Sequence, residues 1–192
     1  SLKPYWAFAW ASGQALARLV LDRPWLVRGR TVLDFGAGSG IAAIAAEMAG
    51  ARKVIACDTD PWAAEMIARN ASLNHVRVEV LREDLLRCAE PPAELILAGD
   101  IFHNWRTWDI SWLFRWTLAG RQILIATPPQ RDFVSGLRPP LVTLRARTHP
   151  AMEPSEIQSV MIYFFGQLQT PERSPPGKGL ARTDKCSYKP FE

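Results

Sequence analysis

The stretch Val32-Leu33-Asp34-Phe35-Gly36-Ala37-Gly38-Ser39-Gly40 decides how this chain folds. Residues Thr31 to Phe35 are apolar and of strand type, and the alanine-rich run from Ile41 to Met48 predicts a helix. The alternate glycines between them allow a tight turn and let a ligand approach the backbone closely. The stretch therefore predicts a strand, a ligand-binding turn and a helix, which is the first unit of a parallel α/β sheet.

The alternation of strand and helix continues along the chain. Helices are expected over residues 11–22, with Ser12 as a cap, 61–73 and 105–118. Further strands are expected over residues 53–57, 77–81, 95–98, 121–126, 141–147 and 160–168. Only short segments separate the last three strands, so the last two can pair antiparallel. We predict an α/β fold of Rossmann type: a seven-stranded, mostly parallel sheet with an antiparallel C-terminal strand and helices on both faces.

Length and composition indicate one globular domain. The chain has 192 residues, of which 48% are hydrophobic and 22% charged, and no apolar run reaches the roughly 20 residues of a membrane span. The three cysteines are widely separated and form no cluster with histidine, so we predict neither a metal site nor a disulfide framework. A reducing compartment, the cytoplasm, is expected. The mitochondrial matrix stays an alternative, because the chain starts at Ser1 and may be trimmed of a targeting segment.

The net charge of +4 is unevenly spread. Residues 101–150 contain seven arginines against only Asp109 and Asp132. One interpretation is that the arginines only reflect a proteome that is rich in arginine. The other is that they form a basic face that steers an acidic partner. No compact basic run of the nucleic-acid-binding type is present, so we expect no nucleic-acid partner.

Three carboxylates follow three successive predicted strands. Asp34 stands just before the glycine turn, where a negative charge suits a cationic ligand. Asp58 can bind both hydroxyls of a ribose, and Asp84 can accept a hydrogen bond from an adenine amino group. An amino-acid cation, a ribose and an adenine together describe S-adenosylmethionine. Dinucleotide binding is disfavoured, because Ile41 occupies the third position of the GxGxxG pattern.

The same residues resemble the class I, or seven-strand, S-adenosylmethionine-dependent methyltransferases. The segment from Asp34 to Gly40 resembles the first motif of that family, and the resemblance covers about residues 4–168. It is strongest to the group that includes the electron transfer flavoprotein beta-subunit lysine methyltransferases and proteins labelled nicotinamide N-methyltransferase-like. The stretches that match this group are residues 4–10, 13–16, 58–61 and 97–102. The resemblance implies a methyltransferase domain over residues 1–170, with residues 1–28 forming a cofactor-covering segment and helix, and a mobile polar tail over 171–192.

The resemblance and the residue types together give a candidate site. The expected cofactor-binding residues are Trp6, Trp10, Asp34, Gly36, Gly38, Gly40, Asp58, Thr59 and Asp84. Asp100, at the end of the fourth strand, is expected to hold the acceptor amine, and His103 to orient it or accept its proton. The alternative for His103 is a loop histidine without a chemical role, since similar proteins carry Tyr or Phe there. Core packing is the alternative for Trp6 and Trp10.

One further departure and one tryptophan series bear on the acceptor. After the fifth strand similar proteins tend to have Asp-Pro, where this chain has Thr127 and Pro128. Tryptophans at 105, 108, 112 and 116 fall on one helical face, either buried against the sheet or, for the first ones, lining the acceptor site.

The resemblance implies a methyltransferase that N-methylates lysine side chains of a protein, with an electron transfer flavoprotein beta-subunit-like acceptor. The alternatives are a small-molecule N-methyltransferase and a methyltransferase-like binding module without activity, which the changes at His103 and Thr127 motivate. We expect a monomer with a protein substrate and no membrane partner.

Overall fold

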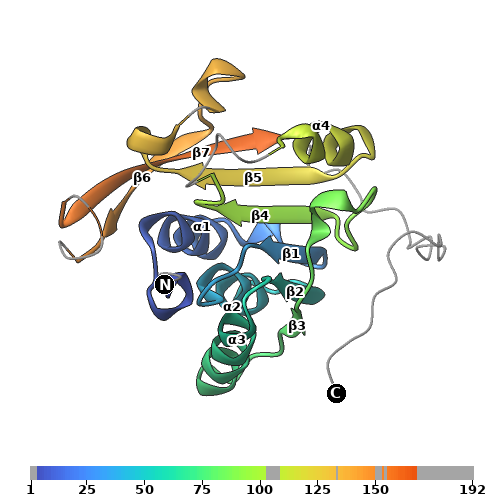
Figure 1. Ribbon diagram of the computed structural model, residues 1–192, viewed down its shortest axis with the longest axis vertical. Coiled ribbons are helices and arrows are strands. Elements are labelled where there is room, and N and C mark those ends of the chain that lie inside the picture. Colours follow the sequence, from blue (N-terminus) through green and yellow to red (C-terminus); the bar gives the residue numbers. More distant parts are fainter. Residues whose placement is uncertain (1–3, 103–108, 133, 150–152, 154, 168–192) are drawn as a thin grey trace.

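The computed structural model describes residues 4–102, 109–132, 134–149, 153 and 155–167. Seven strands form one sheet in the order β3-β2-β1-β4-β5-β7-β6 (Figure 1). The strands are β1 (Thr31–Phe35), β2 (Lys53–Cys57), β3 (Glu79–Leu81), β4 (Leu95–Gly99), β5 (Gln122–Thr127), β6 (Val142–Arg147) and β7 (Ile157–Phe165). The first five pair in parallel, and β7 pairs antiparallel with both β5 and β6. The predicted fold class is confirmed.

Within the described residues, four α-helices and several 3₁₀ turns complete the fold. The helices are α1 (Ala11–Asp22), α2 (Ile41–Met48), α3 (Pro61–Leu73) and α4 (Ser111–Leu118). The 3₁₀ turns are η1 (Tyr5–Ala7), η2 (Pro24–Leu26), η3 (Leu85–Arg87), η5 (Pro129–Arg131) and η6 (Val134–Gly136). No helix within the described ranges is long and apolar enough to cross a bilayer.

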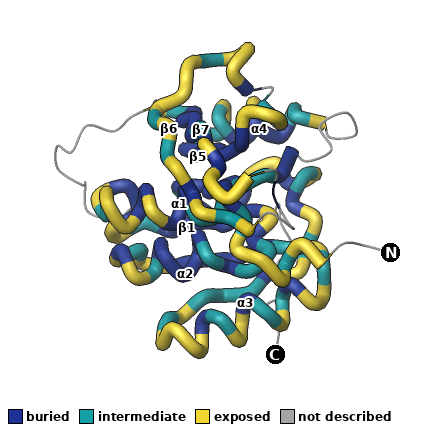
Figure 2. Tube along the Cα trace, turned by 90° about the vertical axis from the view of Figure 1, so that its left-hand side faces the viewer, coloured by how far each residue is buried: buried dark blue, intermediate teal, exposed yellow. Residues whose placement is uncertain are grey.

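The sheet separates two apolar clusters, because successive strand residues face opposite sides. Val32 packs with residues of α1 and α2, whereas Leu33 packs with residues of α4. Helices therefore cover both faces, as predicted. Strands β1 and β5 are buried along their whole length, and the yellow, exposed positions in Figure 2 lie on outer helix surfaces, on loops and on the edge strand β6. This pattern is typical of a parallel sheet enclosed by helices.

The fourth helix starts later than the sequence pattern predicts. It begins at Ser111, because Asp109 accepts hydrogen bonds from both the backbone N–H and the hydroxyl of that residue. Trp112 and Trp116 lie within it and pack on Phe35 of β1, with ring centroids 5.4 and 5.3 Å away, which is the buried interpretation of that tryptophan series. Trp105 and Trp108 lie outside the described residues.

Two smaller expectations differ from the structure, and one is untested. The cap of α1 is Trp10, and Ser12 lies inside the helix and is buried, so the predicted cap was wrong. The third strand is shorter than predicted and starts at Glu79, while the seventh starts at Ile157. The tail over residues 171–192 lies outside the described residues, and the domain boundaries stay predictions.

The tryptophan cluster under the sheet offers a stability test. Trp112 is fully buried between Phe35, Phe102 and Trp116. Replacing it with alanine removes its ring contacts and leaves a cavity, so Trp112→Ala should lower the free energy of unfolding by about 3–5 kcal/mol. Chemical denaturation of both proteins measures the difference. Leu118→Ala is the control: this side chain is 88% exposed, and its loss should change stability by less than about 0.5 kcal/mol.

Candidate functional site

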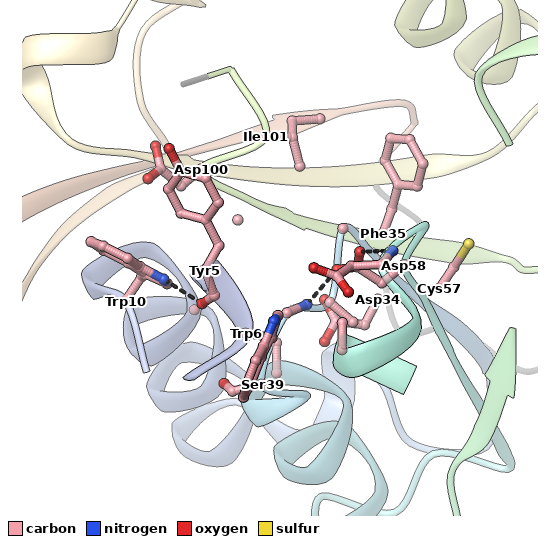
Figure 3. Close-up of a pocket in the computed structure, with 18 of the residues that line it drawn as sticks. Tyr5, Trp6, Trp10, Asp34, Phe35, Ser39, Cys57, Asp58, Asp100 and Ile101 are labelled. Atoms are coloured by element: carbon pink, nitrogen blue, oxygen red, sulfur yellow. Dashed lines mark hydrogen bonds between the residues drawn. The ribbon is translucent and has the colours of Figure 1, made fainter. Parts of the chain in front are cut away.

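A cavity of about 380 Å³ lies where β1, β2 and β4 end (Figure 3). Its walls come from the N-terminal segment, the glycine turn and the segments that follow β2, β3 and β4. The carboxyl ends of these strands meet because β1 pairs in parallel register with both neighbours, Phe35 lying opposite Cys57 and Ala98. All predicted cofactor-binding residues line the cavity except Gly40. Clefts at this edge of an open α/β sheet are its usual ligand sites.

The glycine turn adopts a backbone that side chains disfavour. Gly36 and Gly38 have φ angles of 69° and 53°, in the left-handed region. The N–H groups of Gly36 and Ala37 donate to the carbonyl of Cys57 at 2.9 and 3.0 Å, which ties the turn to the end of β2. Gly40 instead starts α2, and a Cβ there would lie 3.2 Å from Ile67. Gly40 thus has a packing role, and its predicted cofactor contact has no support in the geometry.

Asp58 shapes the turn from the neighbouring strand. Its Oδ2 accepts from the N–H of Gly38 at 2.9 Å, and its Oδ1 accepts from Asp60 N–H at 3.0 Å. A carboxylate has about four lone-pair positions, so two acceptor positions stay available for ligand hydroxyls. The bond explains why an acidic residue at this strand end suits both the turn and a ribose.

Asp34 is more deeply buried than a simple ligand contact requires. Only 3% of the residue is exposed, and Oδ2 accepts from the N–H of Ala43 in the first turn of α2 at 2.9 Å. Burial raises the pKa of this carboxyl to about 7, the Ala43 bond opposes the shift, and the charge of Asp58 adds to it. Near neutral pH the group is therefore balanced between its charged and neutral forms, and a cation beside it would favour the charged form.

Asp84 lies at the third strand end. Its Oδ1 accepts from the N–H of Leu86 at 3.0 Å and so caps the short turn η3. Thr59 and Asp60 line the cavity between Asp58 and α3, and Glu83 adds a carboxylate beside Asp84. Asp60 and Glu83 were not predicted, although each adjoins a residue that was.

Aromatic side chains of the N-terminal segment roof the cavity. Trp6 stacks on Trp62 of α3 with ring centroids 6.4 Å apart. Trp10 donates from Nε1 to the carbonyl of Tyr5 at 2.7 Å, which closes the segment into a compact turn (Figure 3). A Cβ on Gly38 would lie 3.9 Å from the Tyr5 carbonyl, so the segment passes directly over the glycine turn. The sequence did not single out Tyr5, which follows directly on Pro4 in one of the matching stretches.

Asp100 stands at the other end of the cavity, after β4. It has a φ angle of 53°, which is uncommon for a residue with a side chain, and its N–H donates to Ala126 of β5 at 2.9 Å. Figure 3 shows its carboxylate apart from the group formed by Asp34 and Asp58 and on the side of Tyr5. Such backbone conformations concentrate at functional sites. His103 lies outside the described residues, so its predicted role is untested. Thr127 is buried at the end of β5.

The charge of the cavity has one sign. Its described lining contains six carboxylates and no Lys, Arg or His; the six are Asp34, Asp58, Asp60, Glu83, Asp84 and Asp100. A concave site with low-dielectric walls concentrates the field of such charges. The cavity therefore favours a cationic ligand and disfavours phosphate groups.

Comparisons with known proteins agree with this geometry. A family model described as ribosomal protein L11 methyltransferase (PrmA) matches residues 15–102. The chain is 42% identical over 135 residues to the mouse electron transfer flavoprotein beta subunit lysine methyltransferase, an alignment that covers 68% of this chain and 52% of the mouse protein. The corresponding protein of Xenopus laevis is 43% identical over 136 residues, which cover 69% of this chain and 55% of that protein. The chain thus spans about half the length of these relatives.

Solved structures share the fold. Magnesium protoporphyrin IX methyltransferase from Synechocystis, solved with bound S-adenosylmethionine, matches with a TM-score of 0.58 at 16% identity, covering 81% of this chain and 79% of that one. The predicted resemblance is confirmed.

The buried carboxylate offers a test by pH. The folded pKa of Asp34, about 7, exceeds its ordinary value of 3.8, so the native state binds this proton more tightly than the unfolded state. The stability that the proton contributes is present in full below about pH 4 and is lost as the pH rises through 7. In Asp34→Asn the amide oxygen can still accept from Ala43 and cannot ionise. Relative to this variant, the wild-type protein should lose up to about 4 kcal/mol of unfolding free energy between pH 4 and pH 8.

Urea denaturation of both proteins across that pH range measures the difference. Titrations of other groups cancel in the comparison. Stability curves that run parallel would show that Asp34 ionises in the fold with its ordinary pKa.

Proposed function

We propose that this chain, which has the class I methyltransferase fold and is related to the electron transfer flavoprotein beta subunit lysine methyltransferases, transfers the methyl group of S-adenosylmethionine to lysine side chains of a protein. The observation that carries the proposal is the cavity with six carboxylates and no basic residue in its described lining. Both reactants, a sulfonium with an α-ammonium group and a lysine, are cations. A dinucleotide would instead place its pyrophosphate against Asp34 and Asp58, which disfavours it.

The cofactor contacts follow the order of the strands. Asp34 is suited to the α-ammonium group, because its pKa allows it to become charged when a cation binds. Asp58 is suited to the ribose hydroxyls, and Asp84 to the adenine amino group. Trp6 and Trp10 close the cavity over the turn and limit the access of water.

The acceptor end of the cavity is the region around Asp100. The cofactor, when bound, would supply a methyl group on a positively charged sulfur. The uncharged amine of lysine would attack the methyl carbon along the line of the carbon–sulfur bond. A free lysine has a pKa of about 10.4, so most acceptor molecules arrive protonated. The Asp100 carboxylate attracts the ammonium group and aligns it, and the proton leaves before the new carbon–nitrogen bond forms. His103 remains the candidate to accept that proton.

The protein acceptor is proposed from the relatives. Their names identify the beta subunit of the electron transfer flavoprotein, and we propose an acceptor of that kind. The proposal includes a monomer in the cytoplasm that acts on no nucleic acid, as the sequence led us to expect.

Tritiated S-adenosylmethionine distinguishes the kinds of acceptor. The purified chain is incubated with it and a cell lysate, half of which has first been freed of macromolecules by filtration. Label in protein bands, released as methylated lysine on hydrolysis, is the expected result. Label in the filtered fraction alone would indicate a small-molecule N-methyltransferase. Tight binding of S-adenosylhomocysteine without label in either fraction would indicate a binding module without activity.

Cofactor affinity should depend on Asp58. Asp58→Ala removes the carboxylate that is suited to the ribose, so S-adenosylhomocysteine should bind more weakly by roughly 1–3 kcal/mol. Calorimetry measures both affinities, and thermal melting confirms that the variant is folded. Asp109→Ala removes a carboxylate outside the cavity and should leave the affinity unchanged. Equal affinity of Asp58→Ala and the wild-type protein would remove Asp58 from the cofactor site.

Turnover should depend on Asp100 while cofactor affinity should not. Asparagine tolerates the left-handed backbone of this position, so Asp100→Asn removes the charge and keeps the turn. Initial rates with the labelled acceptor should fall about 10²-fold or more, because the incoming amine is no longer aligned. S-adenosylhomocysteine affinity, measured by calorimetry, should stay within about twofold. A variant that methylates at the wild-type rate would contradict the role of Asp100.

A further inference from the structure

The outer half of the β6–β7 pair carries a basic surface that the cofactor site does not use. Arg145 and Arg147 alternate along β6 and are exposed, while Ala146 between them packs into the core beside α1. Across the pair, Ser159 lies opposite Arg145 and exposed Ile157 opposite Arg147. Both arginines therefore project from the sheet face opposite α1. The helix on that face, α4, packs against β5.

Three other arginines in the described part of this half of the chain have partners. Arg115 and Arg138 donate to the backbone carbonyls of Leu86 and Phe164, and Arg121 pairs with Glu90. Arg145 and Arg147 make no hydrogen bond or ion pair with any described residue. Two neighbouring unpaired guanidinium groups are a site for carboxylates, to which arginine binds in a bidentate manner.

The two arginines lie toward the same edge of the sheet as the acceptor end of the cavity. Because β7 runs antiparallel to β5, the end of β6 and the start of β7 lie at the edge where β4 and β5 end, as Figure 1 shows. Glu153 in this turn is buried, and its Oε1 lies 3.4 Å from the N–H of Ala11, the first residue of α1. The hairpin is thus in contact with the segment that carries Trp10 at the cavity.

The strand register gives the separation from the acceptor end. Gly99 lies opposite Ala126, Thr127 opposite Met161, and Met161 opposite Thr143, so the residue after Gly99, Asp100, is level with Thr143. Three strand spacings of about 4.8 Å and two residues of about 3.3 Å place Arg145 roughly 16 Å from Asp100. An extended chain covers that distance in about five residues.

We infer that Arg145 and Arg147 form a docking site for two acidic side chains of the acceptor protein, about four to six residues from the lysine that is methylated. The inference rests on the proposed function, because the proposed methylation defines which lysine of the acceptor is meant. The acidic cavity attracts the lysine, and the basic hairpin attracts carboxylates, so the two surfaces together select a lysine with acidic residues at a set distance. Opposite charges on the two surfaces also fix the direction in which the acceptor lies. A nucleic acid fits less well, because its phosphates would approach six carboxylates.

Binding of fluorescent peptides tests the inference directly. Each peptide has about 15 residues and one lysine. In one acidic peptide two glutamates stand four and six residues before the lysine, and in the other they stand four and six residues after it. In the serine peptide both glutamates are replaced by serine. Anisotropy in the presence of S-adenosylhomocysteine gives the dissociation constants. The wild-type protein should bind one of the acidic peptides about tenfold more tightly than the serine peptide. This ratio of the dissociation constants, serine peptide over acidic peptide, should decrease as salt is added. With Arg145→Glu/Arg147→Glu the ratio should fall to about one or below.

A matched variant separates docking from overall charge. Arg23→Glu/Arg77→Glu changes the net charge equally at two exposed arginines that make no described side-chain interaction. This control should keep the wild-type ratio, and Arg145→Lys/Arg147→Lys should keep part of it. The inference is overturned if the acidic peptides bind no better than serine peptides, or if both charge-reversed variants lose the ratio equally. It is also overturned if a single-stranded RNA of the same length binds more tightly and depends on the same two arginines.

Methyl transfer to the same peptides is measured separately. Binding that depends on the two arginines, without transfer to any peptide, would leave the docking site in place and contradict the proposed activity. Equal transfer to the serine peptide by wild-type and charge-reversed proteins, without preference for glutamate, would support the activity and contradict the docking site.

Discussion

The parallel register of β1 between β2 and β4 is the constraint on which the site depends. It brings Phe35, Cys57 and Ala98 to one level of the sheet. The backbone can then bond from the glycine turn to the carbonyl of Cys57, and the side chain of Asp58 can bond to Gly38. Asp34, Asp58 and Asp100 consequently face one cavity although they are far apart in the sequence. A shift of one residue in this register would turn these side chains to the other face.

Local patterns predicted the fold, and most of the predicted cofactor-binding residues line the cavity. The strand, glycine turn and helix from Thr31 to Met48 have the predicted bounds, because propensity, turn chemistry and burial agree there. The carboxylates at the ends of β1, β2 and β3 line the cavity as predicted, since parallel strands end at a common edge. The burial of Trp112 and Trp116 on one helical face was also predictable, because their spacing matches a helix.

Features that depend on tertiary contacts were not predictable in the same way. The burial of Asp34 and its bond to Ala43 follow from how closely α2 approaches β1. Gly40 is required by Ile67 of another helix, which no local pattern reveals. The stacking of Trp6 on Trp62 joins segments separated by α1, β1, α2 and β2. Helix α4 starts later than predicted, because the Asp109 side chain accepts a hydrogen bond from the backbone N–H of Ser111. Helical periodicity carries no information about such side-chain bonds.

The reversal of direction at β7 has a consequence for how proteins of this architecture can diverge. Because β7 runs against β5, its start and the end of β6 lie at the sheet edge that carries the cavity, while no described residue between them lines the cavity. Insertions or substitutions between β6 and β7 can alter the outer surface without changing the glycine turn. The two halves of the sheet are thus under different constraints, one from the packing around the glycine turn and the other from the outer surface.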